Sequence, residues 1–107
     1  MIVDAASLVR YFDRTAEGHW EVAGELEFVA TFEQLVISPF VIAHIEGAII
    51  HAFGMEGWLA VLEELARGAW TIAAVGPAHL GAMRAAVEAG QSLAEASVAV
   101  LAEGADS

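Results

Sequence analysis

The amino-acid sequence predicts an α/β fold with a short parallel sheet. Three short apolar segments, at residues 1–3, 35–38 and 69–74, have the composition of buried strands, and helical patterns separate each from the next. Strands connected through helices lie parallel, with helices on both faces, so we expect three α/β/α layers. A chain of 107 residues is expected to form one domain, residues 1–107.

The first strand leads directly into a helix predicted over residues 5–12, which carries apolar side chains on one side. A polar turn follows, and Thr15 is expected to cap a second helix over residues 16–29. Trp20 lies at an apolar position of that helix. We therefore expect the Trp20 side chain to pack in the core.

The middle strand is followed by a clear helix start. Ser38 is a favourable N-cap and Pro39 suits the first helical position, so a helix is predicted over residues 39–52. Gly54 is expected to end it. A further helix is predicted over residues 55–66.

The last third of the chain contains the third strand and two more helices. Gly68 should stop the preceding helix, and helices are predicted over residues 77–89 and 92–103. The tail, residues 104–107, carries no structural signal. Aromatic side chains at apolar positions of these elements are expected in the core, namely Trp58 and Trp70.

Asp4 is the most informative single residue, because it stands at the carboxyl end of the first strand. Open α/β sheets place their chemistry at such strand ends. Asp is also a good N-cap residue for a helix that starts at once. The position therefore favours two roles equally, a metal ligand and a helix cap.

The charge balance constrains the partners. The chain has 15 acidic residues against four basic ones and a net charge of −11. Nucleic-acid binders normally present a basic patch, so this chain offers little to a phosphate backbone without a metal ion. Arg10 and Arg14 lie soon after Asp4 and are the candidates for contact with phosphate. A basic protein partner suits the charge equally well.

The remaining composition points to an intracellular protein. There is no cysteine, hence no disulfide framework. The chain opens on a strand-like segment without a basic leader, and its apolar stretches are interrupted by Pro, Gly and charged residues, so neither a signal peptide nor a membrane span is expected. The expected location is the cytoplasm. The 58% content of hydrophobic residues favours a partner that covers part of the surface.

Four stretches together resemble the PIN domain of VapC-type toxins. MIVDAASLVRYFD resembles the opening of that family, usually VDTSAL, and LVISPFVIAHIEGAII resembles its SPFVLAEL segment. GMEGWLAVLEELARGAWTIAAV matches the helix and third strand, and QSLAEASVAVLAE resembles the LADAS helix. These stretches span almost all of the chain.

The resemblance implies a metal-dependent endoribonuclease of a toxin–antitoxin pair. In this family a cluster of acidic residues holds Mg²⁺ or Mn²⁺, and the metal activates water for attack on a phosphodiester. Hard cations prefer oxygen ligands, and a bound metal lowers the pKa of its water. The resemblance further implies RNA as substrate, a cognate basic antitoxin and a homodimer, with no role for DNA.

The chain departs from the family pattern at the acidic positions. Asp4 matches the first of them, and Glu95 replaces the Asp of LADAS. His44 stands where the family has its Glu, and would favour Mn²⁺ or Zn²⁺. Glu88 lies near a further position that is occupied here by Gly90.

The fourth acidic position would lie on a strand after the last helix, so we expect a PIN-like fold without its final strand or strands. On this basis Asp4 and Glu95 are the predicted catalytic and metal-binding residues, with His44 and Glu88 as further candidate ligands. Two carboxylates would hold a hydrated Mg²⁺ or Mn²⁺ weakly.

The resemblance and the departures from the acidic pattern leave two candidate functions. One is a VapC-type ribonuclease with impaired catalysis. The other is a catalytically silent PIN-like protein that binds an antitoxin or dimerises with a partner.

Overall fold

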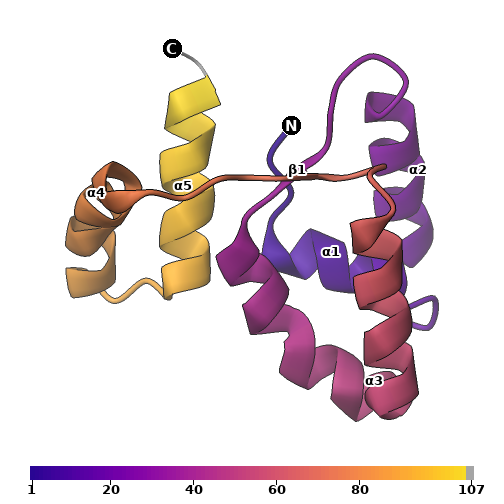
Figure 1. The fold of residues 1–107 in the computed structure, drawn as a ribbon. Helices are drawn as coiled ribbons and strands as arrows, with labels where there is room; N and C mark the ends of the chain where they lie inside the picture. Colours follow the sequence, from indigo (N-terminus) through magenta and orange to yellow (C-terminus); the bar gives the residue numbers. More distant parts are fainter. Residues whose placement is uncertain (106–107) are drawn as a thin grey trace.

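A computed structural model describes residues 1–105, which form a mostly helical molecule around a short parallel sheet (Figure 1). The elements in chain order are α1 (Ala5–Phe12), α2 (His19–Val29), β1 (Val36–Ile37), α3 (Pro39–Ala66), β2 (Thr71–Ile72), α4 (Pro77–Glu88) and α5 (Leu93–Ala105). This composition is compatible with the expected PIN-like α/β fold. The three-layer arrangement stays an expectation.

β1 lies at the centre of the backbone pairing. Val36 pairs with Thr71 of β2 in parallel, and Ile2 forms an isolated parallel bridge to Val36 from the other side. The Val3 amide donates to the Val36 carbonyl at 2.9 Å. The first strand is therefore shorter than predicted, because the chain turns into α1 immediately after Val3 and leaves room for a single bridge.

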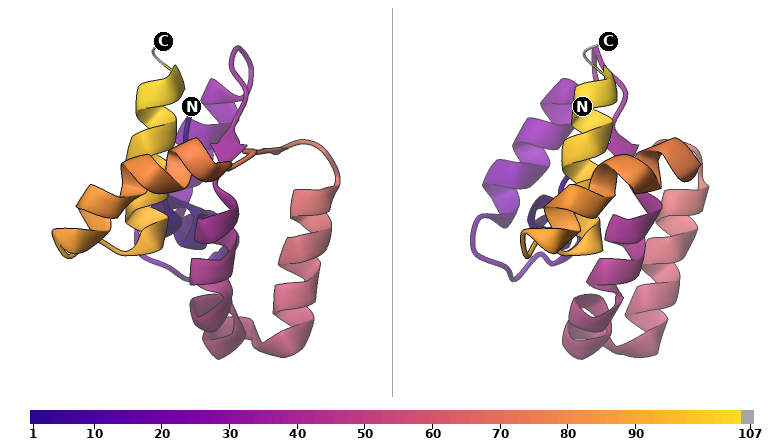
Figure 2. Two further views of the ribbon diagram at one scale, coloured as in Figure 1. Left: turned by 60° about the vertical axis from the view of Figure 1, so that its left-hand side comes forward. Right: turned by 90° about the vertical axis from the view of Figure 1, so that its left-hand side faces the viewer.

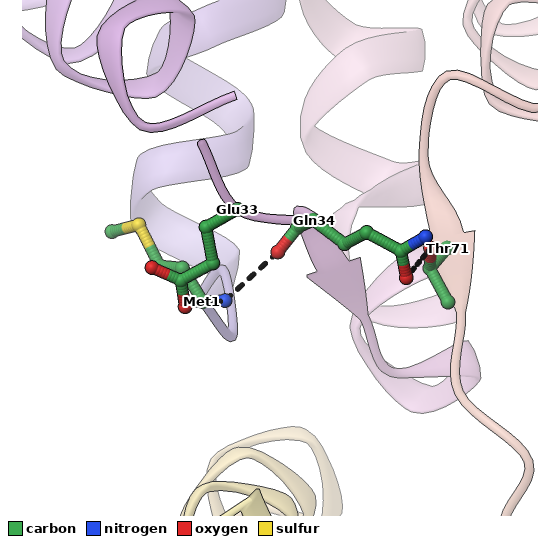
Figure 3. A network of polar contacts seen from close by, with 4 residues as sticks. All are labelled: Met1, Glu33, Gln34 and Thr71. Atoms are coloured by element: carbon green, nitrogen blue, oxygen red, sulfur yellow. Dashed lines mark hydrogen bonds and ion pairs between the residues drawn. The ribbon is translucent and has the colours of Figure 1, made fainter. Parts of the chain in front are cut away.

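Polar contacts join the N-terminal segment, the residues before β1 and β2 at the end of the strands where Met1 and Gln34 lie (Figure 3). The Met1 ammonium group donates to the Gln34 carbonyl at 2.8 Å and pairs with the Glu33 carboxylate. The Gln34 side-chain oxygen accepts from the Thr71 hydroxyl at 3.1 Å. Gln34 thus connects the N-terminal segment to β2 across the start of β1.

The core gathers apolar side chains from the strands and from one face of each surrounding helix. α3 contributes most, at helical spacing on both of its halves. Its buried side chains pack with Leu8 of α1, Leu26 of α2 and Ile37 of β1. The α3 residues are Val41, Ile45, Ile49, Trp58, Val61 and Leu65. Trp58 and Trp70 are both buried, as predicted.

α2 starts later than predicted. Thr15 does not cap it, because the Thr15 hydroxyl donates to the Asp13 carboxylate at 2.6 Å, and Gly18 with φ +83° occupies the N-cap position instead. His19 is consequently the first helical residue, and its Nδ1 bonds the Arg10 carbonyl at 2.7 Å.

The prediction for Trp20 was wrong, since its side chain is 77% exposed. The buried residues of α2 are His19, Ala23 and Leu26, which follow one another at helical spacing. Trp20 lies one position off this line, and the helix therefore turns it away from the core.

α3 consists of two helices joined at a kink. Gly54 has φ +74° and ψ −176°, outside the helical region, and the two halves run side by side in opposite directions (Figure 2). By length and mean hydropathy α3 would suffice to cross a membrane. Each half, however, is shorter than the roughly 20 residues that a span needs. Both halves also bury one face in the core, so we interpret α3 as a core helix pair.

α4 and α5 lie side by side, on the far side of the molecule from the second half of α3 (Figures 1 and 2). α5 extends to Ala105, beyond the predicted end at residue 103. Residues 106–107 of the predicted tail lie outside the described residues.

The kink at Gly54 can be tested with an alanine scan of two glycines. Its backbone conformation is essentially restricted to glycine, so Gly54→Ala should lower the free energy of unfolding by about 1–3 kcal/mol. Gly47 lies on the exposed side of α3, and a Cβ there would contact nothing within 4 Å. Gly47→Ala should therefore raise stability by roughly 0.5–1 kcal/mol. Urea denaturation of both variants measures the difference, and equal effects would contradict the kink.

Candidate functional site

Asp4 follows the bridged N-terminal segment and caps α1. Its Oδ1 accepts a hydrogen bond from the Ser7 amide at 2.7 Å, so the expected helix cap is confirmed. The side chain is exposed. A carboxylate has a second oxygen with free lone pairs, and capping through Oδ1 therefore leaves Oδ2 available to a cation.

Ser38 lies at the same end of the strands as Asp4. Ile2 pairs with Val36, and continuing that parallel register by two residues places Asp4 opposite Ser38. Ser38 is fully buried and caps α3 by accepting from the Phe40 amide at 3.1 Å. The Asp4 and Ser38 positions therefore mark one edge of the sheet.

A buried hydrogen bond attaches α5 to this edge. The Ser38 and Ser97 hydroxyls lie 2.7 Å apart, and the Ser97 hydroxyl donates to the Ala94 carbonyl, also at 2.7 Å. Since Ser97 has one hydrogen and uses it there, the Ser38 hydroxyl must be the donor between them. Each hydroxyl is satisfied, and the start of α5 is fixed beside the strand ends.

Glu95 lies in the first turn of α5, two residues before Ser97. Its amide donates to the Ser92 hydroxyl at 3.1 Å, which caps the helix. Two residues correspond to about 200° around a helix, so the Glu95 and Ser97 side chains leave α5 in nearly opposite directions. The Glu95 side chain is exposed, in keeping with that geometry.

The other predicted site residues lie on separate elements. His44 is exposed on the first half of α3. Glu88 is the last residue of α4 and pairs with Arg84 at 3.3 Å. Arg10 and Arg14 are both exposed, at the end of α1 and in the turn after it.

The described residues do not complete a metal site of the kind that the family resemblance implies. No group of three or more His, Asp or Glu side chains among them is placed to hold an ion. Oxygen donors suit Mg²⁺ or Mn²⁺, but of the predicted ligands only Asp4 directly follows a bridged segment of the sheet. We therefore derive no catalytic step through a metal ion. Asp4 and Glu95 stay predicted ligands.

Sequence reasoning missed a groove of about 650 Å³ between α2 and the second half of α3. Trp20 and Phe53 line it, and they are 77% and 42% exposed. The missed signal is the presence of small side chains on the facing sides of the two helices, which leave room between them. The small side chains in the lining are Ala23, Gly57 and Ala60.

Tyr11 lies where this groove meets a smaller cavity of about 120 Å³. Burial raises the pKa of the Tyr11 phenol, and the negative charges of Glu27 and Glu64 raise it further. Both glutamates line both cavities. Trp20 and Phe53 thus form an aromatic part of the groove. Glu27 and Glu64 place two carboxylates near the Tyr11 phenol.

The chain is similar to Ribonuclease VapC26 of Mycobacterium tuberculosis (strain ATCC 25618 / H37Rv), with 38% identity over 80 residues. These residues are 75% of this chain and 58% of the relative, so the match spans less than two thirds of the relative's length. A scan against protein-family models found no match. The similarity supports a relationship with the VapC-type family.

The Ser38–Ser97 hydrogen bond can be tested with a double-mutant cycle. Ser97→Ala removes the acceptor of a buried hydroxyl, which should cost about 1–3 kcal/mol of stability. Ser38→Ala should cost about as much, since it also removes a helix cap. The double variant should cost less than the sum, with a coupling of at least 0.5 kcal/mol by urea denaturation. Additive losses would show that the two hydroxyls do not interact.

Proposed function

We propose that this chain is a VapC-like toxin ribonuclease that acts on RNA in the cytoplasm and is inhibited by a cognate basic antitoxin. The similarity to Ribonuclease VapC26 carries the proposal. A carboxylate at the strand ends, Asp4, supports it, because that edge is where α/β folds place their chemistry.

In this proposal Asp4 is the first metal ligand at the strand ends, and Glu95 is the second acidic ligand. Mg²⁺ or Mn²⁺ would bind weakly, since Mg²⁺ retains most of its waters when few carboxylates are available. His44 replaces an acidic residue of the family pattern, and we expect catalysis to be impaired as a result. Arg10 and Arg14 are the candidates for contact with the RNA phosphates. A homodimer is proposed on the family resemblance.

A second function is favoured by one observation, the lack of a three-group ligand cluster among residues 1–105. In that case the chain is catalytically silent, and its role is to bind an antitoxin or to dimerise with a partner. The net charge of −11 suits a basic partner under either function.

An RNA cleavage assay separates the two functions. We expect slow cleavage by the parent chain in Mn²⁺ that EDTA abolishes, and loss of cleavage in Asp4→Asn. His44→Glu restores an acidic ligand position and should raise the rate roughly tenfold or more. Glu46→Gln changes an exposed residue on the same helix and serves as the control, with an unchanged rate.

The contradicting results are distinct. Parent and His44→Glu chains that both leave RNA intact would exclude the ribonuclease and leave the silent protein. Cleavage that survives EDTA or Asp4→Asn would exclude Asp4 as the first metal ligand. Calorimetric titration of Mn²⁺ into the parent and Asp4→Asn reports metal binding without relying on activity, and equal binding to both would argue against the site.

A further inference from the structure

A histidine side chain holds the start of α4. His79 is the third residue of this helix, and its Nδ1 accepts a hydrogen bond from the Gly76 amide at 3.0 Å. The Gly76 carbonyl in turn accepts from the Leu80 amide at 3.2 Å. In a capping box, a Glu or Gln side chain usually reaches back to the N-cap amide. Here that role belongs to an imidazole, a group whose charge changes between about pH 5 and 8.

The direction of this hydrogen bond fixes the protonation state of the ring. A backbone amide can only donate, so the Nδ1 of His79 must offer a lone pair, and the ring is neutral with its hydrogen on Nε2. His19 has the opposite arrangement. Its Nδ1 lies 2.7 Å from the Arg10 carbonyl, which can only accept, so this nitrogen carries a hydrogen. A second proton therefore preserves the His19 bond and abolishes the His79 bond.

Nearby charges do not compensate a proton on His79. α4 packs against α5 (Figure 1), whose carboxylates are Glu95 and Glu103. Among residues 1–105, no carboxylate lies within ion-pair distance of the His79 ring. The charged groups of α4 itself, Arg84 and Glu88, pair with each other at 3.3 Å. The positive end of the helix dipole also disfavours a cation in the first turn.

The same hydrogen bond fixes the connection between the sheet and α4. Ala73 follows β2, and its amide donates to the Ile37 carbonyl at 2.9 Å. Gly76 lies three residues further on, so the connecting segment is held at one end by the sheet and at the other by His79. Met83, one turn after His79, is almost completely buried. The first turn of α4 is thus the boundary between this connection and the packed part of the helix.

We propose that His79 is a pH-sensitive helix cap, which holds the start of α4 while its ring is neutral and releases it when the ring binds a proton. The stabilisation is present at high pH and is lost as the pH falls through the range in which the imidazole becomes charged. Residues 76–80 then open, while the paired strands stay folded. This device operates whether or not the chain cleaves RNA.

Amide hydrogen exchange followed by NMR at about pH 8 and pH 5.5 tests the proposal. In the parent chain, the protection factors of the Gly76 and Leu80 amides should fall about tenfold at the lower pH, as for a lost helix cap. The Val36 and Thr71 amides in the sheet should change less than about twofold, since their bonds do not involve the ring.

Three variants separate the hydrogen bond from the charge. His79→Gln retains an acceptor for the Gly76 amide but does not titrate, so its protection factors should stay within about twofold across this range. His79→Ala lacks the acceptor and should show low protection at both pH values. His51→Gln makes the same change at an exposed histidine of α3 and should behave as the parent chain does.

Five results would overturn the proposal. They are a hydrogen on the His79 Nδ1 at about pH 8 in ¹⁵N spectra, parent protection that does not depend on pH, an equal loss in His79→Gln, parent-like protection in His79→Ala, and a loss of the same size at Val36 and Thr71. The last of these would indicate general unfolding in acid rather than release of one helix cap.

Discussion

Backbone pairing on both sides of β1 determines which candidate groups lie together at the ends of the strands. The Val36 amide and carbonyl bond the N-terminal segment on one side, and the Leu35 and Ile37 carbonyls accept hydrogen bonds from Thr71 and Ala73 on the other. This register places the Asp4 and Ser38 positions at one edge, and the Ser38–Ser97 hydrogen bond adds the start of α5. Two-residue strands offer few hydrogen bonds of their own. The register therefore depends on the apolar side chains that cover it, and Val3 and Ile37 are almost completely buried.

The excess of acidic residues places carboxylates at two separate parts of the surface, the strand edge and the groove. At the strand edge, Asp4 combines capping of α1 with an exposed carboxylate, and the described residues supply no third ligand there. In the groove, two carboxylates stand beside aromatic side chains.

Local signals in the sequence sufficed for several features. Three short motifs predict the local backbone from a few neighbouring residues, and each prediction is confirmed. They are Asp4 before a helix, Ser38–Pro39 at a helix start, and Gly54 between two apolar helices. The similarity to Ribonuclease VapC26 agrees with the family that four motifs indicated.

Features that depend on tertiary packing were missed. Trp20 is apolar at helical spacing, yet the position of α2 against α1 buries His19 in its place. Pairing of Ser38 with Ser97, 59 residues apart, has no local signature. The groove is likewise a property of two helices, and neither helix predicts it alone.

The central claim is that the pairing around β1 brings Asp4, Ser38 and the first turn of α5 to one edge, where we propose that Asp4 binds a cation. NMR with substoichiometric Mn²⁺ tests it most directly, because the ion broadens the resonances of nearby amides. The account predicts that broadening appears first at residues 4–5, 38 and 95–97 and is lost in Asp4→Asn. Broadening that spreads evenly over the acidic surface, or that is unchanged in Asp4→Asn, would contradict it.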